Sequence, residues 1–235
     1  MRAVTLTVVA ALLFAASRPA SAAPAPATKP AAGPQKVVYV LDLSGRAITA
    51  RAAMIRETAA AVRQLPPGTP FNVVASGEPK PRYFAPALVP ASDAAAAKVD
   101  AFLEEQTPAG THRLATALAA VEKMRPDVVW LASVGGMSGA EGNVDQVIAA
   151  VKASAARGKY RLNTHTQFAK EQPPENAWNL ARLAEAGGGK CYDDKGDVVM
   201  ADALKPAAKP APAAKPAPAK PAEKPLTRPS VFRER

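Results

Sequence analysis

The stretch Lys36-Val-Val-Tyr-Val-Leu-Asp-Leu-Ser-Gly-Arg46 decides the fold of this chain. Apolar residues run without interruption from Val37 to Leu41 and end at an acid, Asp42. A short apolar run of this kind predicts a strand that is buried on both faces, as in a parallel sheet. Ligands of open α/β sheets bind at the carboxyl ends of the strands. We therefore expect Asp42 and Ser44 to lie where such a fold carries its binding site.

Helical and extended patterns alternate along the chain as far as about residue 200. Apolar residues at three- and four-residue spacing predict helices, and short apolar or alternating runs predict strands. The expected helices cover residues 55–65, 94–103, 114–121, 144–151 and 175–186, with Ser92, Thr111 and Asn143 as helix caps. The expected strands cover 37–41, 71–75, 82–84, 127–133, 160–165 and 190–192. This alternation predicts an α/β fold, a doubly wound and mainly parallel sheet with helices on both faces.

One strand pair should be antiparallel. Only a short connection, residues 76–81, separates the strand at 71–75 from the one at 82–84. A parallel crossover needs about a dozen residues or more, so the second strand should be an antiparallel edge strand.

The first loop carries a resemblance to a known family. Asp42-Leu-Ser44-Gly-Arg46 is similar to the Asp-x-Ser-x-Ser that ends the first strand of von Willebrand factor type A domains. The resemblance covers about residues 36–200 and includes the ending Leu183-Ala-Glu-Ala-Gly-Gly-Gly189 before a last strand. It implies a Rossmann-like fold and an adhesion site in which these groups, a later Thr and a later Asp hold a divalent metal.

That metal site is degenerate in this sequence. Asp42, Ser44 and Thr111 match the pattern, whereas Arg46 replaces the second Ser and Val134 replaces the second acid. Mg²⁺ requires oxygen ligands, and a cation about 4 Å away would repel a unit positive charge by roughly 4 kcal/mol. We therefore expect no metal cofactor, with Arg46 paired with Asp42 or turned to solvent. The plainer alternative is a hydrogen-bonded loop junction, with Thr111 acting as a helix cap.

The two ends of the chain do not look globular. A basic start, an apolar run from Val4 to Ala16 and the motif Ala20-Ser-Ala22 predict a signal peptide over residues 1–22. The apolar run is shorter than the roughly 20 residues of an ordinary membrane span, so no span is expected after cleavage. Residues 23–35 read as a Pro/Ala linker, and residues 204–235 as a disordered Lys/Pro/Ala-rich tail. The globular domain should then cover residues 36–203.

Other chemistries have weaker support. Cys191 is the only cysteine, and a small buried residue is its expected role. His112 and His165 are the only histidines, too few for a zinc site by themselves. The sequence Gly136-Met-Ser138-Gly-Ala140 lacks the final glycine of a hydrolase nucleophile elbow.

These observations favour an exported, non-enzymatic binding module located in the periplasm, the cell envelope or the medium. The expected binding face comprises Asp42, Ser44, Arg46, Thr111, Gly135 and Gly136. Its partner would be an unknown protein or envelope component, and no specific nucleic acid is expected. One alternative is a structural envelope protein, because part of the formal net charge of +10 lies in the tail and could hold an anionic polymer. An esterase-like hydrolase using Ser138 is the other alternative.

Overall fold

The computed structural model describes residues 35–77, 80–111, 113–137 and 142–206. The signal peptide and nearly all of the linker and tail lie outside these ranges, as do His112 and Ser138.

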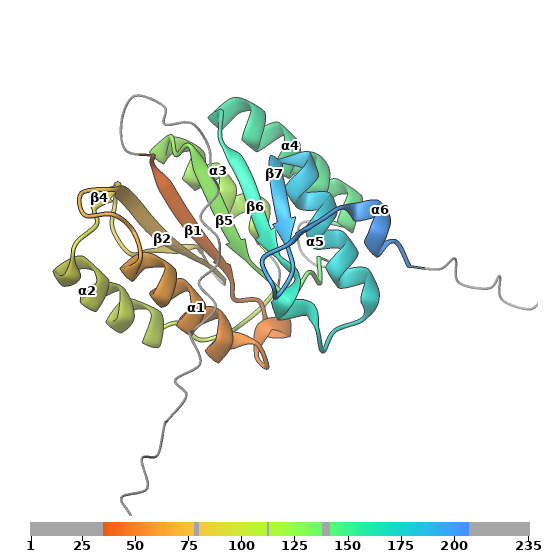
Figure 1. Ribbon diagram of the computed structural model, residues 1–235, viewed down its shortest axis with the longest axis horizontal. Helices are drawn as coiled ribbons and strands as arrows, with labels where there is room; N and C mark the ends of the chain where they lie inside the picture. The colour runs from red at the N-terminus through yellow and green to blue at the C-terminus, as the bar shows by residue number, and fades with distance from the viewer. Residues whose placement is uncertain (1–34, 78–79, 112, 138–141, 207–235) are drawn as a thin grey trace, which may run out of the picture.

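A single mixed sheet forms the centre of the molecule, with strands in the order β3-β2-β1-β5-β6-β7-β8 and β4 also paired with β2 (Figure 1). The parallel strands are β1 Val37–Asp42, β2 Pro70–Ser76, β5 Val128–Ala132, β6 Arg161–His165 and β7 Gly188–Tyr192. The short antiparallel strands are β3 Arg82–Tyr83, β4 Val89–Pro90 and β8 Val198–Val199. The predicted fold class is confirmed, with antiparallel strands at both edges of the sheet instead of one.

Helices connect the strands on both sides of the sheet. They are α1 Arg51–Arg63, α2 Asp93–Glu104, α3 Leu114–Met124, α4 Val144–Gly158, α5 Pro174–Ala186 and α6 Ala201–Leu204, with short 3₁₀ turns η1 Gly45–Ala47 and η2 Thr166–Ala169. Two of the predicted caps are confirmed. The Ser92 hydroxyl accepts a hydrogen bond from the Ala95 amide, and Asn143 forms a capping box with Gln146.

The third cap was predicted wrongly. Helix α3 begins at Leu114 with Arg113 at its N-cap position, so Thr111 precedes the helix and does not cap it. The chain just before it is held elsewhere, because Ala109 donates to the carbonyl of Leu43 and Gly110 accepts from the amide of Gly45. The chain bends at residues 110 and 111, where Gly110 has a φ of 67°, and the helix starts only after this bend.

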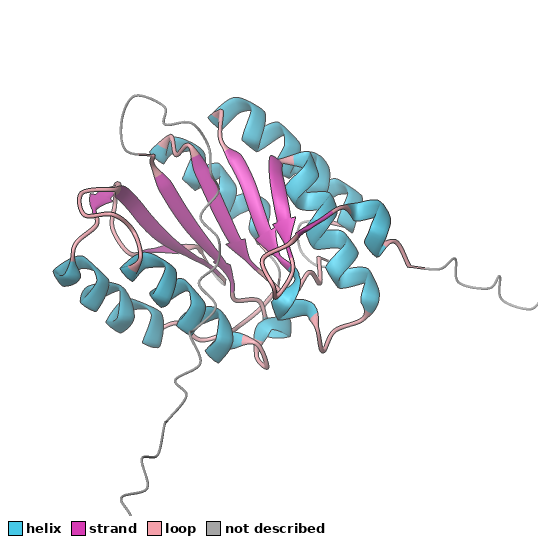
Figure 2. Cartoon of the chain, viewed as in Figure 1, coloured by secondary structure: helices cyan, strands magenta, loops and turns pink. Residues whose placement is uncertain are grey.

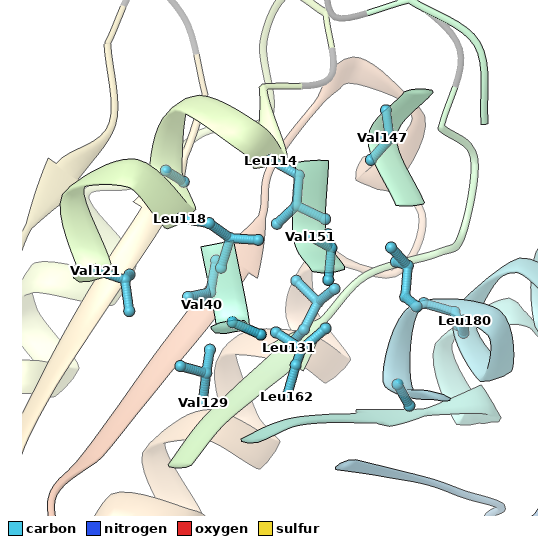
Figure 3. Close-up of a cluster of buried hydrophobic side chains, with 14 of the residues drawn as sticks. Val40, Leu114, Leu118, Val121, Val129, Leu131, Val147, Val151, Leu162 and Leu180 are labelled. Atoms are coloured by element: carbon cyan, nitrogen blue, oxygen red, sulfur yellow. The ribbon is translucent and has the colours of Figure 1, made fainter. Parts of the chain in front are cut away.

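Two apolar layers cover the two faces of the sheet, because successive side chains of β1 point to opposite sides. Val38 and Val40 belong to the layer formed with α3, α4 and α5, shown in Figure 3. Tyr39 and Leu41 belong to the layer formed with α1 and α2. Cys191 is buried in the first layer, as expected. All six residues of β1 are buried, so the strand is central in both directions.

Candidate functional site

Three polar residues form a row at the carboxyl ends of three neighbouring strands. Ser76 ends β2 and pairs in register with Asp42, the last residue of β1. Ser133 follows directly after β5, whose Ala132 pairs with Leu41. All three side chains are buried. The row lies at the end of the sheet where the sequence placed the binding site.

The carboxylate of Asp42 accepts hydrogen bonds from two neighbouring segments. Its Oδ2 accepts a hydrogen bond from the Ser133 hydroxyl at 2.8 Å, and its Oδ1 accepts one from the Ser44 amide at 3.2 Å. The Ser133 oxygen in turn accepts from the Gly135 amide at 3.1 Å. Asp42 thus ties the end of β1 to the loop after β5. Ser133 was missed by sequence reasoning, although it occupies the first position of the Ser-Val-Gly that follows the strand.

Backbone hydrogen bonds hold the surrounding loops together. The Leu43 amide donates to the Ser76 carbonyl at 2.8 Å, and the Gly45 amide donates to the Gly110 carbonyl at 3.1 Å. Thr111 follows directly and is exposed. The loop after β1 is therefore fixed to the loops after β2 and α2, and it presents its side chains from a rigid base.

The two glycines after β5 allow close packing against the start of α5. Gly135 has a φ of +76°, and a side chain there would collide with the backbone of Asn176. The side-chain amide of Asn179 donates a hydrogen bond to the Gly135 carbonyl at 3.3 Å. Both asparagines are buried and escaped the sequence analysis, because their role depends on a contact between distant segments.

Arg46 extends from η1 across this glycine loop. A Cβ atom added to Gly136 would lie 2.9 Å from the Arg46 Cδ atom and 3.2 Å from its Nη1 atom. Arg46 is exposed, and Ile48, which follows η1, has 67% of its surface exposed. The end of the sheet therefore displays an apolar and a cationic side chain on one turn.

Comparison with known proteins identifies the fold. The family model described as von Willebrand factor type A domain matches residues 35–193, more than half of the chain. The chain belongs to the von Willebrand factor type A family. Its fold is consistent with a protein-interaction module.

One solved structure supports the same fold. The chain is similar to a von Willebrand factor type A protein from Catenulispora acidiphila, with a TM-score of 0.55 and 18% identity; the match covers 73% of this chain and 40% of that protein, so this chain spans less than half of its length. A weaker likeness is to the TFIIH p34 N-terminal domain, with a TM-score of 0.44 and 14% identity over 67% of this chain and 90% of that one. Another is to the human COPII-coat protein Sec24c, with a TM-score of 0.42 and 10% identity over 70% of this chain and 30% of that one. At 18% identity, the likeness to the Catenulispora acidiphila protein shows the fold alone. No curated protein matches the chain.

The residues at the type A metal position do not fit a magnesium ion well. Asp42 supplies the only carboxylate in the matched pattern, and both of its oxygens already accept hydrogen bonds. Val134 is fully buried in the apolar layer of α1 and α2, so this position directs carbon into the core where the pattern has an oxygen ligand. The Ser44 hydroxyl is buried without a hydrogen-bond partner among the described residues, and one neutral oxygen cannot replace the missing charge.

Groups for other metal or acid–base chemistry are also scattered. Within the described ranges, no cluster of three or more His, Cys, Asp or Glu side chains could hold a metal. His165 ends β6, as predicted, but its ring stacks on Trp130, and burial lowers its pKa.

Among the residues that the structure describes, no helix is long and apolar enough to cross a membrane.

Proposed function

We propose that this type A domain is an exported, non-enzymatic protein-binding module that docks its partner at the strand-end face without a metal ion. The strand-end face consists of the turn from Gly45 to Ile48 together with the exposed loop around Thr111; Gly135 and Gly136, which the sequence analysis placed on this face, are buried beneath it. The fold and family support a protein-interaction role, and fold alone does not establish a function. Export rests on the sequence of the first 22 residues, which the sequence analysis reads as a signal peptide.

The exposure of Ile48 beside Arg46 is the observation that carries the proposal. Ile48 is the most exposed of the large apolar residues that the structure describes. Binding energy at protein interfaces concentrates in a few apolar, aromatic or arginine side chains that become buried on binding. The backbone of this turn is fixed at its start, because the Gly45 amide donates a hydrogen bond to the Gly110 carbonyl.

The arrangement of the polar groups supports binding over catalysis. Asp42 is fully buried and engaged with Ser133 and Ser44, so it is poorly placed to exchange a proton with a substrate. His165 lies in an aromatic stack with Trp130 and not beside Asp42. The buried polar row therefore holds the loops together by hydrogen bonds, and the exposed side chains contact the partner.

A pull-down from envelope extract tests the proposal. The bait is the mature chain, residues 23–235, compared with the variants Ile48→Asp and Arg46→Glu and with a control, Tyr83→Asp. Tyr83 is also an exposed apolar residue, but it lies on β3 at the edge of the sheet. We expect one protein to be retained by the bait and the control and lost from both strand-end variants. Retention by all four chains would contradict docking at this face.

Removal of residues 207–235 distinguishes the alternative role as an envelope protein held by its basic tail. If the shortened chain keeps the partner, the domain does the binding. If it loses both the partner and its affinity for polyanions, the tail does the binding and the proposal fails.

A further inference from the structure

Half of the sheet is covered by described helices on one face only. Helices α3, α4 and α5 share an apolar layer with β5, β6 and β7. On the other face, α1 and α2 pack over β1 and β2. Figure 2 shows β6 and β7 with no long helix in front of them, whereas Trp130 and Ala132 of β5 pack against the edge of the α1–α2 layer. Parallel sheets are normally buried on both faces, so this part of the sheet requires another cover.

Three rings from three neighbouring strands line this face, and we call them the aromatic ledge: Trp130 of β5, His165 of β6 and Tyr192 of β7. The ring centroids of Trp130 and His165 are 5.2 Å apart, and Tyr192 lies 5.5 Å from each of them. Trp130 and His165 are half-buried. Tyr192 is buried and its ring is tilted by 33–35° to the other two, so the ledge presents mainly the Trp130 and His165 rings on the α1 side of the sheet.

Charged residues from β6, β7 and α1 border the ledge. Arg161 and Lys190 are exposed and, by strand alternation, face the same side as His165 and Tyr192. Glu57 of α1 is close enough to His165 to act on it electrostatically. The border thus has two cations, Arg161 at the amino end of β6 and Lys190 in the middle of β7, which disfavour a strongly basic occupant.

The segment before β1 fits this surface in composition and position. Residues 23–35 contain prolines at positions 24, 26, 30 and 34 and a single charged side chain, Lys29. They join the domain at Lys36, whose amide donates to the Asp127 carboxylate at 2.8 Å and whose carbonyl accepts from the Val128 amide at 3.1 Å. The segment therefore leaves the domain directly beside the amino end of β5.

Its length is also sufficient. In a polyproline II conformation, 13 residues extend about 40 Å, at roughly 3.1 Å per residue. A five-residue strand such as β5 is about 17 Å long at roughly 3.3 Å per residue. Proline-rich segments in this conformation bind aromatic surfaces well, because they lose little conformational entropy on binding.

The C-terminal tail is proline-rich too, but its lysines at 209, 215, 220 and 224 would be placed near Arg161 and Lys190.

We propose that residues 23–35 bind across the aromatic ledge as a polyproline II segment and form the missing cover of this half of the sheet. The contact is intramolecular and lies on the sheet face, away from the strand-end face proposed for partner binding. It leaves the strand-end face open to a partner.

Tryptophan fluorescence of the full mature chain tests this contact. The chain has only Trp130 and Trp178, so a Trp178→Phe background isolates Trp130. We compare this chain with one in which residues 23–34 are replaced by a Gly/Ser sequence of equal length. We expect the replacement to shift the emission to longer wavelength and to raise the acrylamide quenching constant about twofold, because an aromatic side chain regains contact with water. A synthetic peptide of residues 23–35 should reverse both changes.

A matched replacement of residues 209–220 in the tail is the control and should leave Trp130 unchanged. The proposal is overturned if the N-terminal replacement has no effect, or if the tail replacement produces the same change. A second measurement leaves the segment intact. A nitroxide on Ala27→Cys should quench Trp130, whereas one on Ala213→Cys should not, and Cys191 is buried with a raised pKa and should stay unlabelled. Equal quenching from both labels would also overturn the proposal.

Discussion

At the scale of single residues, the row Ser76, Asp42 and Ser133 shows how a binding motif can become a support for loops. The carboxylate of Asp42 remains, and its oxygens accept hydrogen bonds from Ser133 and from the Ser44 amide. Burying a carboxylate is costly unless donors compensate for the lost water, so each of these hydrogen bonds matters for folding.

The first prediction concerns the hydrogen bond from Ser133 to Asp42. We expect Ser133→Ala to lower the free energy of unfolding by about 1–3 kcal/mol, because the buried Asp42 carboxylate loses the hydrogen bond from the Ser133 hydroxyl. Urea titration monitored by circular dichroism measures the change. Ser76→Ala is the matched control, since the Ser76 hydroxyl is equally buried but has no hydrogen-bond partner among the described residues. An equal loss in both variants would contradict a specific role for Ser133.

The second prediction concerns His165. Burial lowers its pKa below the ordinary value of 6.5, and the nearby Glu57 only partly opposes this effect. The unfolded chain therefore binds a proton more readily than the folded one, and stability should fall as the pH drops through 6.5 toward the lower folded pKa. Urea titrations between pH 7.5 and 5.5 should show this slope in the unchanged protein and in His112→Gln. The slope should flatten in His165→Gln, and its persistence there would contradict the assignment.

At the scale of elements, helix ends reveal where the sequence is not optimal. Two helices end at residues with a left-handed backbone, Arg125 after α3 with φ 49° and Lys159 after α4 with φ 54°. Glycine adopts this conformation without the steric cost that a Cβ atom imposes. Both residues nevertheless form a backbone hydrogen bond. The Arg125 amide donates to the Glu122 carbonyl, and the Lys159 amide donates to the Ala155 carbonyl.

The third prediction follows from the end of α4. We expect Lys159→Gly to raise the free energy of unfolding by about 0.5–1 kcal/mol, because it removes the left-handed strain of an exposed side chain. Lys152→Gly is the control in the middle of the same helix and should lower it by about 1 kcal/mol. Thermal melting of both variants gives the two signs. Destabilisation by Lys159→Gly would show that its side chain contributes more than its backbone costs.

At the scale of the whole molecule, the domain relies on its two apolar layers for stability. A disulfide within the chain is not available, because the chain has one cysteine. The layers meet at β1, whose residues contribute alternately to each. Val134 adds to the layer of α1 and α2 at the position where the type A pattern has an acid, so packing there replaces ligand binding.

The fourth prediction concerns metal. A ligand present at about 100 times its dissociation constant raises stability by roughly 2.7 kcal/mol, which thermal melting detects readily. We expect millimolar Mg²⁺ or Mn²⁺ to leave the melting temperature of the full mature chain unchanged. We also expect Val134→Asp to lower it with or without Mg²⁺, because the new carboxylate would be buried in an apolar layer. A rise of several degrees with Mg²⁺ that a chelator reverses would restore a metal-dependent adhesion site.

The sequence by itself determined the fold class and the place of the candidate site. Periodicity is a local property, so the uninterrupted run before Asp42 predicts a central strand, and its end marks the site. Ser92 and Asn143 were also predictable as helix caps, because a cap acts within its own first turn.

Only the tertiary structure decided what the site residues contact. The donor to Asp42 comes from Ser133, 91 residues away in the chain, and the backbone that forces Gly135 to remain glycine belongs to Asn176. Thr111 lost its predicted role because backbone bonds from the loop after β1 hold the residues just before it. The aromatic ledge likewise arises from three separate strands brought side by side. Such contacts depend on how distant segments pack, so residue spacing within one segment does not predict them.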